Sequence, residues 1–320
     1  MGRKRPINQR KERMIMKLLT YEYQNSGARA GVKSDGCVVD LTELLGSDVE
    51  IKDIKMLMEL YPDAVNEIRD ALETGTYQKK IPLEDVKLLA PVLHPSTIRD
   101  SCMFEVHSDN AGKESAVVTP PLWYERPIFY YQNPNNVTGP EAHVRRKTGC
   151  TTLDYESEVA FVIGKRGFNP GIEEAKDYIL GLTIFNDWSD RELCGKEAGF
   201  LGMHKSKDFA TGLGPWIVTM DEFEDKMVDG KLNLYVKAWV NDVLTTDSTT
   251  SDMYWPLDRL FSVVAEDVEV LPGDIVGIGT VGLGCLLEQI EKFPFLKDGD
   301  RVTIQVEGIG TLRQYVAKPE

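Results

Sequence analysis

The segment that decides the fold is the ten-residue run DYESEVAFVI, residues 154–163. Alternate side chains of a β-strand share one face of the sheet, so the carboxylates of Asp154, Glu156 and Glu158 point the same way. An alanine and a valine follow them on that face. Apolar residues at these two positions are unusual on a solvent-exposed face of a strand. On an inner face, the stacked carboxylates repel one another unless water or a cation separates them.

This acidic strand leaves two interpretations open. Oxygen ligands select Mg²⁺, Ca²⁺ or Mn²⁺ over softer metals, so an inner face predicts a site for a hard divalent cation. The alternative is a solvated acidic strand on an acidic protein, because the chain of 320 residues carries a net charge of −14.

Strands predominate in the sequence around this segment. Residues 14–45 alternate apolar and polar side chains around Ser34-Asp35-Gly36, which predicts a β-hairpin. Residues 53–74 have helical periodicity, interrupted at Pro62, with Gly75 as the C-terminal cap. Further strands are expected at 81–99, 180–185, 232–240, 275–278 and 301–316, and helices at 173–179 and 251–266. The pattern predicts a β-rich α+β fold with a mixed or antiparallel sheet.

The chain divides into three predicted parts. Residues 1–13 hold six basic residues and one acidic residue, which predicts a basic, disordered leader; a nucleic-acid tail or an organelle-targeting leader is the alternative. Residues 14–90 are expected to form a small N-terminal β-rich domain, and residues 91–320 the catalytic domain. Residues 105–150 contain many loop formers, so we expect a long irregular stretch there.

Composition narrows the classes of partner and compartment. An acidic protein body repels nucleic acid and anionic membranes, so neither is expected as a partner. No apolar run approaches the roughly 20 residues that a membrane-spanning helix needs. The five cysteines are widely spaced and contain no CxxC, which argues against a disulfide framework or a zinc site. We therefore expect a cytoplasmic protein.

A second candidate segment, NDWSDRE at residues 186–192, follows a strand that is expected to be buried. Strand ends that lead into loops present binding groups on a rigid scaffold. The segment also fits a helix start, because Ser189 and Glu192 have the spacing of a capping box. A capped helix can still hold Asp187 and Arg191 toward a site, so the two interpretations are compatible.

Three further segments contain candidate residues. His107 lies in the expected irregular stretch, seven residues after Asp100, and is one of only four histidines in the chain. The segment KSKDFATG at residues 205–212 is, by itself, a basic turn. Four glycines within residues 277–284 would let the backbone approach a ligand closely, but the lysine of a phosphate-binding loop is missing.

Together, these segments resemble the fumarylacetoacetate hydrolase family from about residue 14 to the end of the chain. The motifs that carry the resemblance are DYESE at 154–158, NDWSDR at 186–191, Asp100 seven residues before His107, Lys207 twenty residues after Asp187, Thr211 four residues further on, Gly279-Thr280 and Glu288. The resemblance implies a mixed β-sheet roll or barrel of that family's type, a small N-terminal β domain and a homodimer.

The resemblance also implies a role for each candidate residue. The ligands of a Mg²⁺, Ca²⁺ or Mn²⁺ ion would be Asp100, Glu156, Glu158 and Asp187. The catalytic residues would be His107 as general base, Glu288 as its orienting partner, and Lys207 and Arg191 as stabilisers of negative oxygen. The substrate-binding residues would be Tyr130, Thr280 and Thr211.

The predicted reaction is metal-dependent hydrolysis of a C–C bond in a small β-diketo or 2-oxo acid, acylpyruvate- or fumarylacetoacetate-like. Positions at which the family hydrolase contacts the far end of its substrate are occupied here by Cys102, Ala116 and Cys194. Smaller acylpyruvates therefore fit better than fumarylacetoacetate. The alternatives are an isomerase, decarboxylase or hydratase of 2-oxo or 2-hydroxy-dienoic acids on the same metal site, or a non-catalytic metal-binding homodimer.

Overall fold

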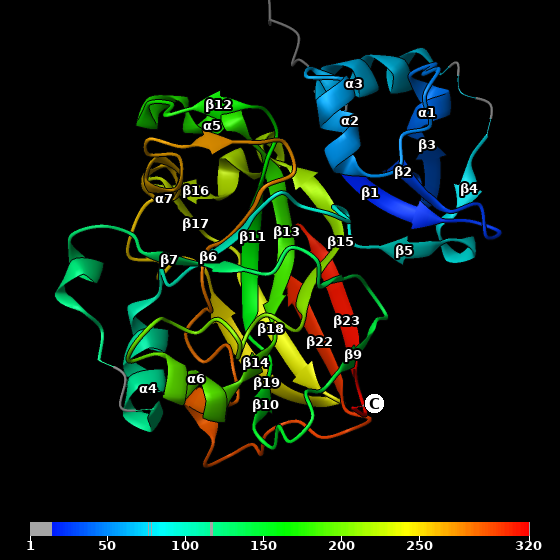
Figure 1. Ribbon diagram of the computed structural model, residues 1–320. Helices are drawn as coiled ribbons and strands as arrows, with labels where there is room; N and C mark the ends of the chain where they lie inside the picture. Colours follow the sequence, from blue (N-terminus) through cyan, green and yellow to red (C-terminus); the bar gives the residue numbers. More distant parts are fainter. Residues whose placement is uncertain (1–14, 76, 78, 116–117, 320) are drawn as a thin grey trace, which may run out of the picture.

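A mixed sheet of twelve strands forms the body of the protein (Figure 1). The computed structural model describes residues 15–319, except residues 76, 78, 116 and 117. The predictions for the basic leader, residues 1–13, and for Ala116 lie outside these described residues. The twelve strands are β1 (Lys17–Glu22), β2 (Ala28–Ser34), β3 (Cys37–Asp40), β4 (Ile81–Pro82), β5 (Lys87–Leu89), β6 (Ile98–Ser101), β7 (Phe129–Gln132), β8 (Val137–Thr138), β11 (Ser157–Ile163), β13 (Ile179–Asp187), β15 (Thr211–Thr219) and β21 (Ile275–Gly277).

The main path of this sheet runs β4-β3-β2-β1-β15-β13-β11-β21-β6-β7, with β5 beside β1 and β8 beside β15. The pairs β21–β6 and β15–β8 are parallel, and the others are antiparallel, so the predicted β-rich α+β fold with a mixed sheet is confirmed. The order of the described strands is open rather than closed, which favours the roll over the barrel.

A second sheet of five strands packs against the first. Its order is β19 (Val243–Thr249), β18 (Tyr235–Val240), β22 (Arg301–Val306), β23 (Gly310–Ala317), β9 (His143–Arg145). Two-stranded ribbons join β10 (Leu153–Asp154) to β14 (Ser189–Asp190), β12 (Gly167–Phe168) to β20 (Glu269–Val270), and β16 (Met227–Val228) to β17 (Lys231–Leu232).

The helices are short and lie around the sheets (Figure 1). The α-helices are α1 (Leu41–Leu44), α2 (Ile54–Leu60), α3 (Ala64–Thr74), α4 (Glu105–Ser115), α5 (Ala175–Tyr178), α6 (Arg191–Glu197) and α7 (Leu257–Val264). The 3₁₀ turns are η1 (Leu83–Asp85), η2 (Pro121–Tyr124), η3 (Ile172–Glu174), η4 (Met220–Lys226) and η5 (Leu287–Gln289). None of the helices in the described part of the chain has both the length and the apolar character needed to span a membrane.

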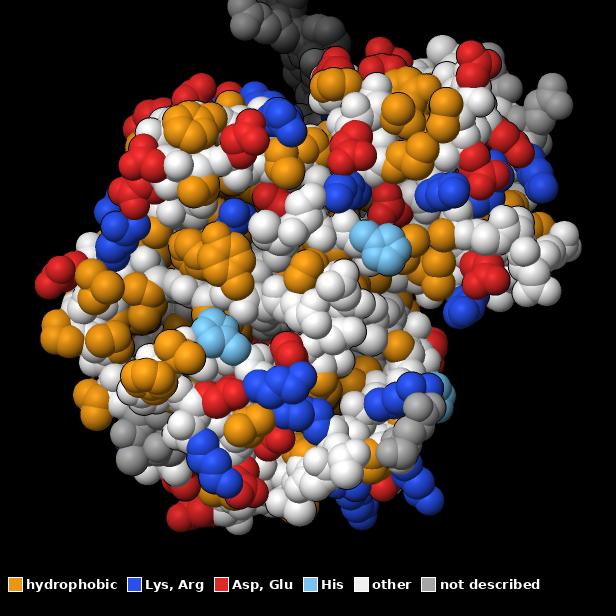
Figure 2. Space-filling model, in the orientation of Figure 1, with side chains coloured by type: hydrophobic (Ala, Val, Ile, Leu, Met, Phe, Trp, Pro, Cys, Tyr) orange, Lys and Arg blue, Asp and Glu red, His pale blue; other side chains and the backbone are white. Residues whose placement is uncertain are grey.

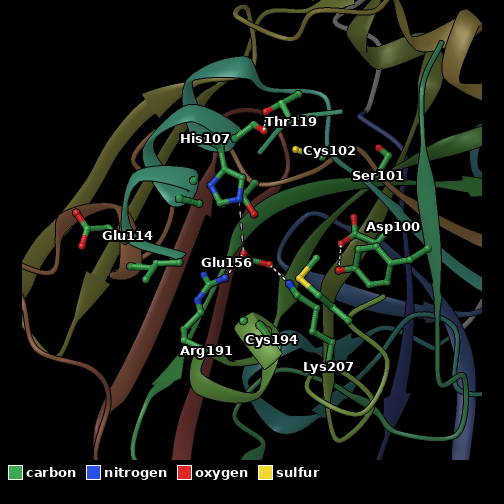
Figure 3. Close-up of a pocket in the computed structure, with 18 of the residues that line it drawn as sticks. Asp100, Ser101, Cys102, His107, Glu114, Thr119, Glu156, Arg191, Cys194 and Lys207 are labelled. Carbon is green, nitrogen blue, oxygen red and sulfur yellow. Dashed lines mark hydrogen bonds and ion pairs between the residues drawn. The ribbon is translucent and has the colours of Figure 1, made fainter. Parts of the chain in front are cut away.

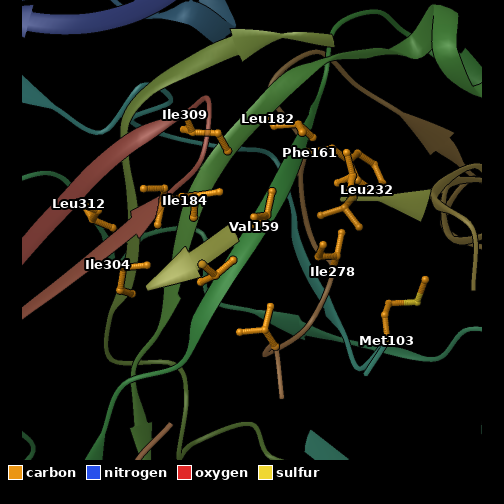
Figure 4. Close-up of a cluster of buried hydrophobic side chains, with 14 of the residues drawn as sticks. Met103, Val159, Phe161, Leu182, Ile184, Leu232, Ile278, Ile304, Ile309 and Leu312 are labelled. Carbon is orange, nitrogen blue, oxygen red and sulfur yellow. The ribbon is translucent and has the colours of Figure 1, made fainter. Parts of the chain in front are cut away.

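The strands β11 and β13 lie at the centre, and every residue of both is buried. One face of β11 presents Val159 and Phe161 to the large core between the two sheets (Figure 4). The other face presents Ala160 and Val162 to a second core, which α2 and α3 also line. The acidic strand therefore has no solvent-exposed face, and the prediction of an inner face is confirmed.

The N-terminal elements follow the sequence closely. Asp35 and Gly36 both have positive φ in the predicted hairpin, as a two-residue turn that fits the twist of its strands requires. Gly75, with φ of 65°, ends α3 as predicted. Strand β1 pairs with β15, so this region shares the large sheet with the remainder of the chain. The division into domains at residue 90 stays a prediction.

The structure corrects several local predictions. The expected strand at 81–99 is divided into β4, η1, β5 and an irregular stretch before β6. Residues 105–115 form the helix α4, so the predicted irregular stretch is wrong there; this segment lacks an apolar stripe, and its helix is held by contacts with η5. The acidic strand is interrupted between Asp154 and Ser157, where β10 ends and β11 begins. The cap of α6 is Asp190 rather than Ser189, because the Asp190 carboxylate accepts the N–H of Leu193.

Candidate active site

A cavity of about 630 Å³ opens at the end of β6 and the start of β11, and residues of the helices α4 and α6 line its sides (Figure 3). A volume of this size suits a small organic ligand. Eight of the predicted site residues line it: Asp100, His107, Tyr130, Glu156, Glu158, Arg191, Lys207 and Thr280. Asp187 and Glu288 lie directly behind this lining and bond to it.

Three carboxylates from three strands meet at the floor of the cavity. Oxygen atoms of Asp100 (β6), Glu158 (β11) and Asp187 (β13) lie within 4.8 Å of one another, and all three side chains are buried. Strand β21 runs between β6 and β11, and its Gly277 makes the approach possible. A Cβ atom at this glycine would lie 2.3 Å from Asp100 Oδ1 and 3.2 Å from Glu158 Oε2. The glycine run thus makes room for the protein's own carboxylates.

Positive charge balances these three carboxylates only in part, through the contact of Lys207 with Asp187. Burial raises the pKa of Asp100, Glu158 and Asp187, and repulsion from neighbouring carboxylates adds to the effect. Asp100 Oδ1 and Asp187 Oδ1 are also buried without a hydrogen-bond partner among the described residues. Buried, unpaired oxygens at this spacing fit a hard divalent cation, which would satisfy them and offset their charge. The alternative of a solvated acidic strand is excluded by their burial.

Glu156 is the fourth predicted ligand, but its surroundings differ. Its carboxylate accepts hydrogen bonds from Arg191 Nη1 at 2.8 Å and from Lys207 Nζ. Burial alone would raise the pKa of Glu156, but the two cations lower it well below its ordinary value. Glu156 therefore stays ionised between the carboxylate cluster and the basic residues, and Figure 3 shows it at the centre of the site.

Both basic side chains are buried and stay charged. Burial disfavours the ammonium of Lys207, but Asp187 and Glu156 raise its pKa well above the ordinary value. Burial would likewise lower the pKa of Arg191, but nearby carboxylates, Glu156 above all, raise it well above its ordinary value. The Asp154 carboxylate accepts a hydrogen bond from Arg191 Nε at 2.8 Å. It also accepts the backbone N–H groups of Leu286 and Leu287, at the start of η5. Asp154 thus positions Arg191, a role that the sequence did not reveal.

A histidine–glutamate pair stands above the carboxylates. His107 Nδ1 lies 2.8 Å from Glu288 Oε1, and His107 Nε2 lies 3.7 Å from Glu156 Oε1. Glu288 also accepts the N–H groups of Leu283 and Gly284. Burial would raise the pKa of Glu288, but the hydrogen bonds from His107, from the N–H of Leu283 and from Asn110 lower it. An ionised carboxylate only accepts hydrogen bonds, so Nδ1 donates to Glu288, and Nε2 is the ring nitrogen on the side of Glu156.

The predicted substrate-binding residues have different positions. The hydroxyl of Tyr130 donates to Asp100 Oδ2 at 2.6 Å and contacts Asp187, and Thr280 Oγ1 donates to Glu158 Oε1 at 3.0 Å. Both line the cavity. Thr211 is not part of the described lining; its hydroxyl donates to Gln132 at 2.6 Å, and that amide donates in turn to the Tyr130 hydroxyl.

Gln132 and Gln314 were missed at the sequence level. The Gln314 side-chain oxygen accepts bonds from Asn186 and Trp188, which fixes the segment that carries Asp187. The two glutamines lie in strands with no recognisable motif, so no local sequence signal identifies them.

A comparison with protein families gives one match over most of the chain. A family model described as fumarylacetoacetate (FAA) hydrolase C-terminal matches residues 97–317. This range includes every candidate site residue named above. An uncharacterized protein of Staphylococcus aureus (strain USA300) is 29% identical over 318 residues, and the alignment covers 95% of this chain and 100% of that protein.

Solved structures share the whole architecture. A 5-carboxymethyl-2-hydroxymuconate delta-isomerase from Mycobacterium smegmatis is 25% identical with a TM-score of 0.67, covering 95% of this chain and 100% of that chain. A maleylpyruvate hydrolase from Sphingobium sp. SYK-6, solved with a manganese(II) ion and pyruvate, is 24% identical with a TM-score of 0.71 and the same coverage. The likeness to the second structure extends to the fold alone.

Proposed function

Because the chain belongs to the fumarylacetoacetate hydrolase family, we propose that it is a divalent-metal-dependent hydrolase that cleaves a C–C bond in a small acylpyruvate-like β-diketo acid. The observation that carries the proposal is the meeting, in one cavity, of three buried carboxylates with incompletely satisfied oxygens and a histidine–glutamate pair. A structural metal site does not need a general base beside it, which argues against the non-catalytic alternative.

Asp100, Glu158 and Asp187, with Glu156 beside them, would hold the metal. Their all-oxygen donor set suits Mg²⁺, Ca²⁺ or Mn²⁺. The manganese(II) ion in the Sphingobium maleylpyruvate hydrolase supports this choice of metal class. When bound, such a cation would polarise a carbonyl group of the substrate and offset negative charge on its oxygen.

His107 would take a proton from water through Nε2, because Glu288 holds the proton of Nδ1 on the opposite side of the ring. The water oxygen then bonds to a carbonyl carbon of the substrate. The neighbouring C–C bond breaks, and its electron pair forms an enolate. The proton held by His107 returns to the enolate carbon, so that a carboxylic acid and a 2-oxo acid leave.

Lys207 and Arg191 would stabilise the negative oxygen that develops during this step. Both remain charged inside the site, as their raised pKa values indicate. Arg191 Nη2 is buried without a hydrogen-bond partner among the described residues and therefore has a donor to offer. Preorganised donors of this kind contribute roughly 3–4 kcal/mol each to the transition state.

An isomerase of 2-oxo or 2-hydroxy-dienoic acids is the second candidate. The observation that favours it is the likeness, at 25% identity, to the Mycobacterium smegmatis isomerase. A general base in the position of His107 could move a proton between two carbon atoms of an enolate without the attack of water. Only the products separate the two reactions.

The test is an assay with acetylpyruvate and Mn²⁺ or Mg²⁺, with the products identified by NMR, beside assays with oxaloacetate and a 2-hydroxy-dienoic acid. We expect acetate and pyruvate in equal amounts. The variant His107→Ala should lose roughly 10²- to 10⁴-fold in kcat, the usual contribution of a general base. Its Mn²⁺ binding, measured by electron paramagnetic resonance, should persist. Full activity in His107→Ala, or isomerised product alone, would contradict hydrolysis through this base.

A further inference from the structure

The cavity has two unlike ends. The floor consists of the carboxylates and cations already described. Away from the floor the walls are apolar, and they include Val118, Trp123, Ile128, Met203, Leu287 and Phe295. Figure 2 shows hydrophobic side chains gathered over α4 and the segment that leads from it toward β7, so apolar surface continues outside the cavity. A ligand that fills the cavity therefore has one polar and one apolar end.

The polar atoms within these walls are satisfied by the protein itself. The indole N–H of Trp123 donates to the carbonyl of Cys102 at 2.5 Å, which leaves the ring as an apolar surface. The hydroxyls of Ser108 and Thr119 bond to each other at 2.5 Å. Neither pair needs a polar group from the ligand.

Each basic side chain that lines the described part of the cavity already has carboxylate partners. Lys207 is held by Glu156 and Asp187 on the floor. Arg191 is also on the floor, where it is paired with Asp154 and Glu156, and its unpartnered Nη2 lies at this polar end. Lys196 pairs at 2.6 Å with the carboxylate four residues before it on α6. No described lining cation is left over for a second carboxylate at the far end.

Acidic side chains add to this asymmetry. Glu114 lies on the same helix as His107, and Figure 3 shows it on the side away from Asp100. Glu192 on α6 also lines the cavity. Glu192 is paired with Lys196, so the repulsion of an anionic group that approaches the apolar end comes from Glu114. An ionised carboxylate placed there would lose its water without gaining a partner, which is strongly unfavourable.

We propose that the substrate carries an uncharged, apolar acyl chain at the end remote from its oxo-acid head, and that diacids are discriminated against. The head-group part of this inference rests on the proposed function. A cavity of about 630 Å³ has room for a chain of several carbons beyond the head. The apolar walls would bind each buried methylene group and favour longer acyl chains over acetyl.

The test compares two ligands of equal length, 2-oxooctanoate and 2-oxooctanedioate, which share the oxo-acid head and differ only in the terminal methyl or carboxylate group. Their binding to the Mn²⁺-loaded protein is measured by titration calorimetry, which does not depend on turnover. We expect the monoacid to bind at least about tenfold more tightly, the effect of some 1.4 kcal/mol. Equal or tighter binding of the diacid would overturn the proposal.

The variant Met203→Arg supplies the missing cation at a half-buried position of the wall, and Met203→Leu is its matched control. Met203→Arg should shift the ratio of the two affinities toward the diacid by at least fivefold, and Met203→Leu should leave it unchanged. A ratio that moves equally in both variants would also contradict the proposal.

Turnover of acetylpyruvate distinguishes this proposal from the proposed function. If the monoacid is preferred but no acylpyruvate is cleaved, the proposed hydrolysis fails and the apolar end stands. If acetylpyruvate is cleaved but the monoacid does not bind more tightly than the diacid, the proposal of an apolar acyl chain fails and the proposed hydrolysis stands. The same conclusion follows if acetylpyruvate is cleaved and neither oxo acid binds. If nothing is bound or cleaved, both fail.

Discussion

Two buried clusters of charge in the described part of the protein are built on opposite principles. In the N-terminal region, Asp40 accepts hydrogen bonds from Tyr21 at 2.6 Å, from Arg29 at 2.6 and 2.9 Å, and from the N–H of Glu43 at 3.1 Å. Each charge there has its partner. At the floor of the cavity, Asp100 Oδ1 and Asp187 Oδ1 have none among the described residues.

The pKa values express the same difference. Burial would raise the pKa of Asp40, but Arg29, Tyr21 and the backbone N–H lower it below its ordinary value. Burial raises the pKa of Asp187 well above its ordinary value, and Lys207 only partly opposes the rise. A cluster that stabilises the fold satisfies its own charges, whereas a cluster that binds a cation leaves charge for the ligand to satisfy. The same substitution at the two sites should therefore have opposite effects.

The largest effect is expected for Asp187→Asn. The loss of one metal-ligand oxygen should reduce kcat/KM by about 10³-fold, equivalent to about 4 kcal/mol of charge stabilisation. In the metal-free protein, the new amide can keep its oxygen toward Lys207 and donate its N–H to a neighbouring carboxylate. The free energy of unfolding, measured by urea denaturation in EDTA, should rise by about 1 kcal/mol.

Mn²⁺ titration of the same variant provides a second measurement. In the unaltered protein, Mn²⁺ at about 100 times its Kd should stabilise the fold by about 2.7 kcal/mol, and in Asp187→Asn this stabilisation should largely disappear. Unchanged stabilisation by Mn²⁺, or a metal-free variant less stable than the unaltered protein, would contradict the view that the cluster is built for a cation.

The fold was predictable from the sequence where local patterns and tertiary packing agree. The hairpin at Ser34-Asp35-Gly36 and the end of α3 at Gly75 both follow from turn and cap chemistry, which acts within a few residues. The helix α4 was not predictable, because it is held by bonds from His107 and Asn110 to Glu288, almost 180 residues away along the chain. Periodicity contains no information about such contacts.

The arrangement of the site was likewise predictable only in part. The alternation of Glu156 and Glu158 indicated an inner acidic face, and their burial bears it out. The approach of Asp100 to Glu158 depends on Gly277 in the strand between them, which only the sheet order reveals. The different surroundings of Glu156, paired with two cations, likewise required the three-dimensional arrangement.

The next effect is expected for Asp40→Asn, far from the chemistry. The amide leaves Arg29 with the exposed Glu50 as its remaining ionised partner. The free energy of unfolding should therefore fall by about 3 kcal/mol, the low end for a broken buried pair, because Arg29 still reaches water. The kcat/KM of the folded variant should stay within about twofold of the unaltered protein. Asp35→Asn, which removes one partner of an exposed pair with Lys80, is the control and should change neither quantity measurably.

The smallest effect is expected in the pH dependence of the difference in unfolding free energy between the unaltered protein and Asp40→Asn. Because the pKa of Asp40 is lower in the folded than in the unfolded protein, its stabilisation is fully present above the unfolded value of about 3.9 and is lost as the pH falls through the folded value. The unfolding free energies of the unaltered protein and Asp40→Asn, both metal-free, should thus differ by a constant amount from pH 7 to about pH 5 and converge below about pH 4. The carboxylates of the cavity titrate equally in both proteins and cancel in the difference. A difference in unfolding free energy that is undiminished at pH 3, or that already narrows between pH 7 and pH 5, would mean that Asp40 is not the ionised partner of Arg29. The N-terminal cluster would then no longer be an example of buried charges that satisfy one another.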